Sequence, residues 1–314
     1  GGWAAPRRGG VTATGVGALS TTGLSALTAI QVGGLSTASI GALGTTNLRA
    51  LSTTQLGGLI GTQIAGLSTT NLAALTTTQV AALTAGQLAA LTTSQVNSLT
   101  TTTLGAITST QIKSLEVVDI AALSTASLAA LTTTQVAGLT ALQLGKLTTT
   151  QAAALTTTFA SGLSAAQIKG LEVEDLKALS TSVISGLTTT QVAGLTAPQL
   201  GGLTTTQFGA LSTTGLSALT AIQVGGLSTA SIGALGTTNL QALSTTQLGG
   251  LKATQIAGLS TTNLAALTTT QVAALTAVQL AALTTTQAAA LTTTFAGGLS
   301  AAQIKGLEVE DLKA

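Results

Sequence analysis

The sequence predicts an all-α repeat solenoid built from a unit of eight residues. Residues 11–314 divide into 38 consecutive octads without insertion or deletion, and the octad at 267–274, LTTTQVAA, is typical. The first position is Leu everywhere except Val11 and Ile107, and the sixth is always apolar. A strict short period is the signature of an array whose units stack on their neighbours. We therefore expect a non-repeat N-terminal arm at residues 1–10, followed by a single octad-repeat solenoid.

The polar positions of the octad predict one short, capped helical turn per repeat. One continuous helix would rotate the Leu by roughly 80° per octad and form no apolar stripe, so the helix must break once per repeat. Ser or Thr at position two, followed three residues later by Gln, is the capping-box pattern. In the typical octad Thr268 is the expected cap and Gln271 its reciprocal partner. Val272 and Leu275 are the expected buried pair, and the small residues at positions seven and eight allow close approach.

The alternative fold is a β-solenoid, with three octads per coil. Thr and Val favour strands, and ladders of stacked Gln or Asn occur in such folds. Against it, Ala-Ala before Leu is poor strand material. Positions one and six also differ in parity, so one straight strand cannot bury both. The helical form is favoured, and the β form remains the alternative.

Three octads carry acidic residues, and two of them, 171–178 and 307–314, have a charge order that matches the helix dipole. In the octad 171–178, Glu172, Glu174 and Asp175 fall in the expected first turn, and Lys177 falls in the last. The octad 307–314 repeats this order with Glu308, Glu310 and Asp311, and the third acidic octad contains Glu116 and Asp119. No Gly turn of the calcium-loop kind accompanies these carboxylates. We interpret them as helix-start charges that aid solubility, not as metal ligands or catalytic groups.

Long internal duplications define the unit of the array. Residues 17–94 recur at 209–286, an offset of 192 residues or 24 octads, and residues 147–178 recur at 283–314, an offset of 136 residues or 17 octads. Because 17 is divisible by neither two nor three, the single octad is the unit. Any coil of several octads must then have nearly equivalent faces.

Composition argues against several classes of function. The chain has no His, Cys, Met or Tyr, and only 6% of its residues are charged, with a net charge of +2. Enzymes depend on those side chains for proton transfer, nucleophilic attack and metal ligation, so we predict no enzyme, no cofactor and no metal. Nucleic-acid binding needs clustered Lys and Arg, which are absent beyond Arg7 and Arg8. Thr, Ser and Gln interrupt every octad, so no membrane span is expected.

The first ten residues contain the only candidate contact residues. Four Gly and one Pro argue against a regular element there. Trp3 would anchor the arm on a neighbouring subunit, with Arg7 and Arg8 as polar contacts, because aromatic and Arg side chains contribute disproportionately to interfaces.

The motif Leu-Thr-Thr-Thr-Gln-Val-Ala-Ala, iterated without gaps over residues 11–314, resembles the octapeptide-repeat regions of large bacterial secreted and surface proteins of the adhesin type. The resemblance implies an extracellular or cell-surface location and a structural or adhesive role. It transfers no catalytic or binding residue.

These observations lead to two functional hypotheses. The first is a structural repeat protein that forms an extracellular filament, sheath or adhesin stalk by stacking of octads and self-association, with copies of itself as partner. A nearly uncharged exterior repels other copies weakly, and the array reaches Ala314 on a complete octad without a polar capping repeat. The alternative is a Thr-rich surface that binds an ordered ligand such as ice or a cell-surface polysaccharide.

Overall fold

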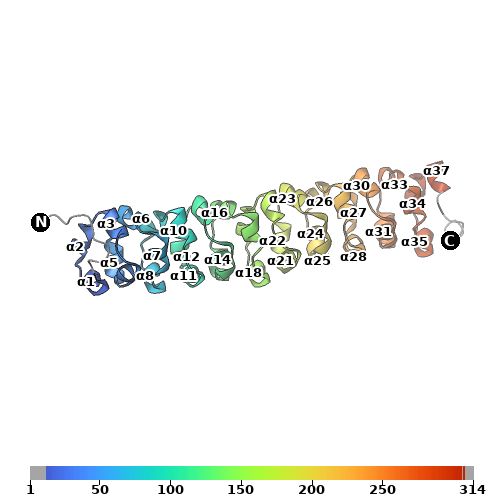
Figure 1. Cartoon of the computed structure of the whole chain (residues 1–314). Coiled ribbons are helices and arrows are strands. Elements are labelled where there is room, and N and C mark those ends of the chain that lie inside the picture. The colour runs from blue at the N-terminus through green and yellow to red at the C-terminus, as the bar shows by residue number, and fades with distance from the viewer. Residues whose placement is uncertain (1–11, 306, 308–314) are drawn as a thin grey trace. The chain divides into compact units, whose positions relative to one another are not determined.

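The computed structural model describes residues 12–305 and 307, and the regular structure in this part of the chain is entirely helical. It contains 37 short helices, one in each described octad from 11–18 to 299–306, and no strand. The α repeat fold is confirmed and the β-solenoid alternative is wrong. The Thr-rich segment that favoured strands forms the first turn of each helix. The chain divides into two compact units, Gly1–Ala154 and Leu155–Ala314 (Figure 1).

The first unit contains helices α1 to α18. Their bounds are α1 Ala13–Gly17, α2 Thr21–Ser25, α3 Ala29–Gly33, α4 Thr37–Gly41, α5 Thr45–Ala50, α6 Thr53–Gly57, α7 Gly61–Ala65, α8 Thr69–Ala73, α9 Thr77–Ala81, α10 Ala85–Ala89, α11 Thr93–Asn97, α12 Thr101–Gly105, α13 Ser109–Ile112, α14 Val117–Ala122, α15 Thr125–Ala129, α16 Thr133–Gly138, α17 Ala141–Leu144 and α18 Thr149–Ala153.

The second unit contains helices α19 to α37. Their bounds are α19 Thr157–Ser161, α20 Ala165–Ile168, α21 Val173–Ala178, α22 Thr181–Ser185, α23 Thr189–Gly194, α24 Ala197–Gly202, α25 Thr205–Gly209, α26 Thr213–Ser217, α27 Ala221–Gly225, α28 Thr229–Gly233, α29 Thr237–Gln241, α30 Thr245–Gly249, α31 Ala253–Ala257, α32 Thr261–Ala265, α33 Thr269–Ala273, α34 Ala277–Leu280, α35 Thr285–Ala289, α36 Thr293–Gly297 and α37 Ala301–Ile304.

Each octad breaks the helix at its first two positions, as the octad 51–58 shows. Leu51 has extended backbone angles, φ −64° and ψ 132°, and so does Ser52, the N-cap, with φ −66° and ψ 159°. The helix α6 follows, and Gly58 ends it in the right-handed α region. Two extended residues in succession turn the chain between consecutive helices.

The predicted capping box forms at the start of most helices. In the typical octad the Thr268 hydroxyl accepts from the backbone N–H of Gln271 at 3.2 Å, and Gln271 Oε1 accepts from the N–H of Thr268 at 3.1 Å. These two bonds satisfy donors that a helix start otherwise leaves unpaired. Pro198 lies within the first turn of α24, where its missing N–H costs little.

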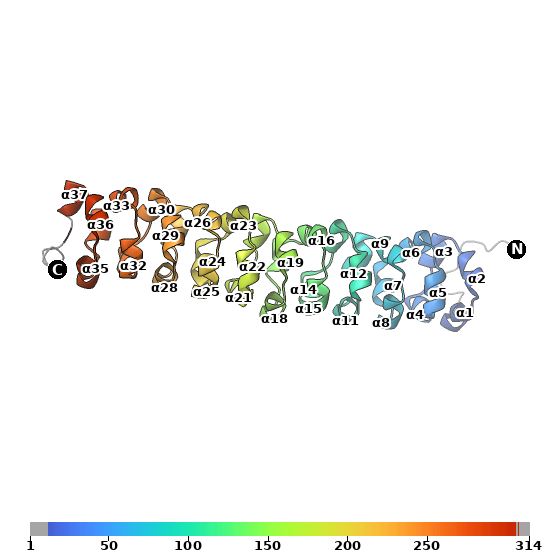
Figure 2. The same ribbon diagram turned by 180° about the vertical axis from the view of Figure 1, so that it is seen from behind.

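Three octads make one coil of each solenoid unit. Helix contacts within a unit follow a spacing of three: α13 packs on α16, α1 on α4, and α27 on α30. Figure 1 shows one such pair of the second unit, α28 and α31, side by side, and Figure 2 shows another, α29 and α32. One coil therefore takes 24 residues, and each unit has three faces of stacked short helices.

The core of each unit is lined by positions one and six of the octads. Leu56 is fully buried and Leu59, the next Leu in position one, is 3% exposed. Burying one such side chain contributes roughly 1.5–3 kcal/mol. A helix of five residues is unstable in isolation because nucleation is unfavourable. The octads therefore depend on the shared core and on their neighbours in adjacent coils.

Position eight lies where helices of adjacent coils approach most closely. A Cβ at Gly138, which ends α16, would lie 2.2 Å from the carbonyl oxygen of Ser109 in α13. A Cβ at Gly202 would meet a Val173 methyl at the same distance. The expectation of tight contact at this position is confirmed at both glycines.

One octad sequence occupies two different faces of the second unit. Residues 155–178 recur at 291–314, and the described parts of both copies belong to this unit. Helix α19 lies in the row that continues with α22, whereas its copy α36 lies in the row of α33. Phe159 and Phe295, equivalent in sequence, are both fully buried in these different rows. One octad sequence can thus occupy more than one face.

Several expectations fall outside the part of the chain that the structure describes. They are the N-terminal arm at 1–10 with Trp3, Arg7 and Arg8, and the acidic residues Glu308, Glu310 and Asp311. The single solenoid over 11–314 also stays a prediction. Among the described helices, none has the length and apolar character that crossing a membrane requires.

Candidate functional surface

The fifth residue of the octad joins neighbouring coils, and Gln135 illustrates how. Its Oε1 accepts the N–H of the cap residue Thr132 at 3.0 Å. Its Nε2 donates to the carbonyl oxygens of Leu104 and Ile107, at 2.8 and 2.7 Å, in the preceding coil. The side chain is 3% exposed. One amide therefore closes its own helix start and binds the coil before it.

The same pair of donated bonds, to carbonyls 28 and 31 residues earlier, recurs along both units. In the first unit it is made by Gln55, Gln79, Gln87, Gln95, Gln143 and Gln151. In the second it is made by Gln191, Gln199, Gln207, Gln247, Gln255, Gln271, Gln279, Gln287 and Gln303. The polar chemistry of these octads is used inside the fold.

Positions two to four provide most of the hydroxyl groups on the surface. In α6, α9 and α12, which stack in that order, the residues at positions three and four are all exposed. They are Thr53 and Thr54, Thr77 and Thr78, and Thr101 and Thr102. No charged residue occurs between 50 and 112. This row is a flat, uncharged surface of hydroxyl and methyl groups that repeats once per coil.

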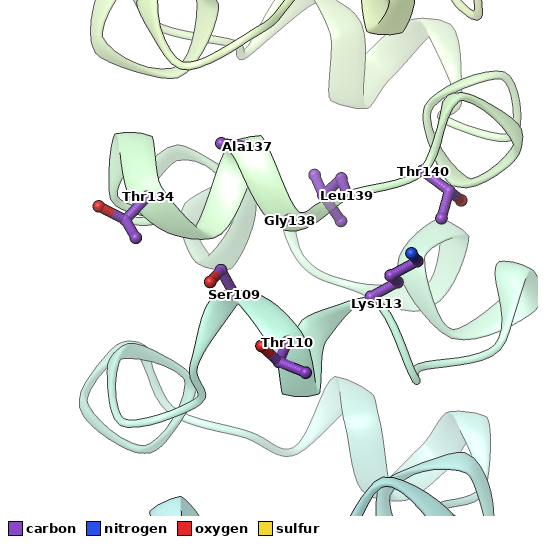
Figure 3. A pocket seen from close by; sticks show the side chains of 8 residues that line it. All are labelled: Ser109, Thr110, Lys113, Thr134, Ala137, Gly138, Leu139 and Thr140. Carbon is purple, nitrogen blue, oxygen red and sulfur yellow. The ribbon is translucent and has the colours of Figure 1, made fainter.

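Another face of the first unit has an open groove next to Lys113. The groove has a volume of about 500 Å³ and lies between α13 and α16. Figure 3 shows Lys113 extending towards Leu139 and Thr140, with Thr110 and Thr134 on the two helices. A second groove of about 390 Å³ shares Lys113 and Thr140 and continues over Glu116. Together the two grooves are lined by one cation, one carboxylate and several hydroxyl groups.

Two exposed apolar side chains, Val118 and Leu142, lie at or next to the second groove in the sequence. Val118 in α14 is 56% exposed and Leu142 in α17 is 65% exposed. Both occupy position four, and their helices pack against each other in successive coils. They replace the Thr of the typical octad, so this surface combines apolar side chains with the charged groups of the grooves.

The acidic octads are only partly what the sequence predicted. In α21 the charge order is confirmed, with Glu172 as N-cap and an ion pair of 2.9 Å between Lys177 and Glu174. Asp119 and Asp175 are different, because they are 1% and 3% exposed. The interpretation as solubilising surface charge is wrong for these two carboxyls. Their position five faces the preceding coil and not water.

Burial alters the protonation of both carboxyls. Loss of solvation raises the pKa of Asp119 to about 6, aided by the nearby Glu116 charge and opposed by the Glu116 N–H that Asp119 accepts. Burial likewise raises the pKa of Asp175, against the hydrogen bond from Glu172 N–H. Asp175 Oδ2 is buried and has no hydrogen-bond partner. Neither carboxyl is accessible to a substrate, so their shifted pKa values do not indicate acid–base catalysis.

Two features were not predicted from the sequence: the hydrogen bonds that the Gln side chain donates to the preceding coil, and the burial of Asp119 and Asp175. A signal for both was present, because Gln, Asn or Asp fills position five in 28 of the 38 octads. Helix capping alone tolerates more variety than this. Such uniformity indicates a side chain that also meets a fixed partner.

Comparison with known proteins supports the repeat character and no specific activity. Three stretches match the model of a family described as ALTTAQ repeat, at residues 37–69, 112–149 and 168–205. A comparison with curated proteins gave no match. Over these stretches the chain is similar to a known repeat family.

Proposed function

We propose that this chain is a structural repeat protein that forms a filament, sheath or stalk outside the cell or on its surface. The observation that carries the proposal is the division of labour within the octad. Position five binds coil to coil, positions one and six fill the core, and in α6, α9 and α12 positions three and four are exposed. Such a unit lengthens the array without adding chemistry.

Self-association is supported by the uncharged exterior. Residues 50–112, 178–251 and 253–304 contain no charged side chain. Copies that meet along these surfaces repel each other weakly. Their exposed rows also repeat with the coil, so one favourable lateral contact recurs at every coil. Copies of the chain are therefore the proposed partner, and no catalytic step is proposed.

The experiment measures assembly as a function of concentration. Sedimentation velocity over a hundredfold concentration range should show species larger than the monomer, and electron microscopy should show elongated polymers. Replacing Thr54, Thr78 and Thr102 by Lys places three like charges on one row and should shift assembly to higher concentration at low salt. Strictly monomeric chains without polymers at high concentration would exclude the filament and sheath and leave the stalk.

A second candidate function is favoured by the row on α6, α9 and α12. Hydroxyl and methyl groups at a fixed repeat could match an ordered surface such as ice or a polysaccharide. Replacing Thr53, Thr77 and Thr101 at position three by Lys should abolish such binding, measured at concentrations at which the chains are monomeric. The measurements are thermal hysteresis and retention on insoluble polysaccharide, and equal values for the variant and the original chain would exclude this candidate.

A further inference from the structure

The octad of α14 places a carboxyl where the typical octad has an amide. Asp119 Oδ2 accepts the N–H of Glu116 at 3.1 Å, so it reproduces the capping half of the Gln arrangement. The side chain is 1% exposed. The other half of the arrangement, donation to the preceding coil, needs a hydrogen that an ionised carboxyl lacks.

A side chain of this length reaches the preceding coil at other positions. Asn71 Nδ2 donates to the carbonyl oxygen of Leu43 at 2.9 Å, and Asn263 Nδ2 donates to that of Leu235 at 2.7 Å. Both acceptors lie 28 residues earlier in the chain. For Asp119 the equivalent acceptor is the carbonyl of Leu91, the first residue of the octad that contains α11. Helix α14 does pack on α11.

We propose that Asp119 is a proton-dependent link between two coils of the first unit. With its proton, the carboxyl donates to the Leu91 carbonyl and completes the arrangement that Gln makes elsewhere. Without its proton, two acceptors face each other in a buried site. The contact between α11 and α14 then weakens. On deprotonation the O–H bond of the carboxyl breaks and the proton passes to water; on protonation the step is reversed.

The charges around Asp119 agree with this assignment. Neither α11 nor α17, the helices packed on α14, carries a titratable side chain, and α15 carries none. The charged groups of the neighbourhood are Glu116 on the same octad, Lys113 just before it and Lys146 after α17. Burial is the largest influence on Asp119, and its pKa of about 6 places the change in a mildly acidic range.

Asp at position five always occurs in the same sequence context, Leu-Glu-Val-x-Asp. This context is found at 115–119, 171–175 and 307–311. In the second unit Asp175 Oδ2 is buried without a partner, which is the state expected of an acceptor at this position. The device is independent of self-association, since it concerns contacts within one chain.

The first test measures the protonation itself. The chain has three Asp residues, so aspartate labelled with ¹³C at the carboxyl gives three signals, which Asp119→Asn and Asp175→Asn assign. The signal of Asp119 should titrate near pH 6. Titration near its ordinary value would overturn the proposal.

The second test measures opening of the coil. Hydrogen exchange of the α11 and α14 amides, corrected for intrinsic exchange, should show about tenfold greater opening at pH 7.5 than at pH 5. Asp119→Asn should remove this difference, and it should fold, because Asn occupies position five in four other octads. Asp175→Asn is the matched control and should leave α11 and α14 unchanged. A pH dependence that persists in Asp119→Asn would overturn the proposal.

Discussion

The side-chain amide of Gln135 donates to the main-chain carbonyl of Leu104 at 2.8 Å, across 31 residues of sequence. The same side chain accepts the N–H of Thr132 in its own octad. A single residue type thereby couples the smallest local structure, a helix start, to the longest repeated contact, the stacking of coils. This coupling explains why a unit of eight residues, too short to fold alone, is regular over hundreds of residues.

Removing this amide should destabilise the first unit. Gln135→Ala breaks three hydrogen bonds and leaves the carbonyl of Ile107 without its donor, while the carbonyl of Leu104 keeps the N–H of Ile107. We expect a loss of about 3 kcal/mol in the free energy of unfolding, from the cost of unsatisfied buried groups. Chemical denaturation followed by circular dichroism measures it. Thr134→Ala, an exposed neighbour in the same helix, is the control and should change stability by less than about 0.5 kcal/mol.

A shorter amide at this position should give an intermediate result. Asn71 reaches the preceding coil but makes no bond back to the N–H of its cap residue Ser68. Gln135→Asn should therefore keep one carbonyl contact and lose the cap bond, at a cost of about 1–2 kcal/mol. Equal destabilisation by Asn and Ala would contradict the separate roles of the two ends of the amide.

The local structure was predictable from the sequence and the coil was not. Thr268 and Gln271 form the cap predicted for them, because capping depends only on residues within one helical turn. The number of octads per coil depends on the turn between helices, which packing of distant octads determines. The period of eight residues is compatible with several such turns.

Asp119 shows why the candidate site was harder to predict. Its neighbour Glu116 begins the same helix and is exposed, and an acid in a first turn is normally a surface charge. The burial of Asp119 follows from the coil before it, which supplies the wall that excludes water. A residue whose role depends on a partner 28 positions away has no local signature. The recurrence of amides at position five was the available indication.

Placing a carboxyl at a Gln position should create a new pH dependence of stability. Gln135→Glu has the length of Gln, and its carboxyl meets the carbonyls of Leu104 and Ile107. Burial should raise its pKa, as it raises that of Asp119 to about 6. The folded state then binds more protons than the unfolded state above about pH 4. Stability is therefore highest below that pH and falls as pH rises through the folded pKa.

The size of this change follows from the shift. A displacement of about two pKa units corresponds to about 3 kcal/mol between pH 3.5 and pH 7. Thermal unfolding of Gln135→Glu at a series of pH values measures it, with Gln135→Ala as the non-titrating control. A difference between the two variants that is the same at pH 4 and pH 7 would refute the argument.

Close approach of α13 and α16 should make Gly138 intolerant of any side chain. An added Cβ would lie 2.2 Å from the Ser109 carbonyl oxygen, and the contact is backbone, which cannot rotate away. We expect Gly138→Ala to cost about 1–3 kcal/mol through overpacking. Gly105 provides the matched control, because it also lies in the last turn of a helix and no atom is within 4 Å of its added Cβ. Gly105→Ala should stabilise by about 0.5–1 kcal/mol by reducing the entropy of the unfolded chain. Both values come from the same denaturation experiment.

Deleting whole coils should be tolerated better than deleting single octads. Removing residues 219–242 takes out three octads, one full coil, so every following helix keeps its row and the octad at 243 takes the place of the octad at 219. Removing residues 219–226 alone moves every following helix to another row. Gln side chains would still find carbonyls in the new row. However, matched close contacts would be lost, such as that of Gly226 with Ala197, where an added Cβ would lie 2.7 Å from the Ala197 side chain. Gly250 takes the place of Gly226 in the longer deletion, whereas Ala234 takes it in the shorter one. We expect the denaturation midpoint to change little for the 24-residue deletion and to fall for the 8-residue deletion. The slope of the free energy of unfolding against denaturant concentration should decrease in proportion to the length removed. Equal midpoints for the two deletions would mean that close packing between particular octads contributes nothing to stability. The hydrogen bonds of position five would then alone determine which coils can stack.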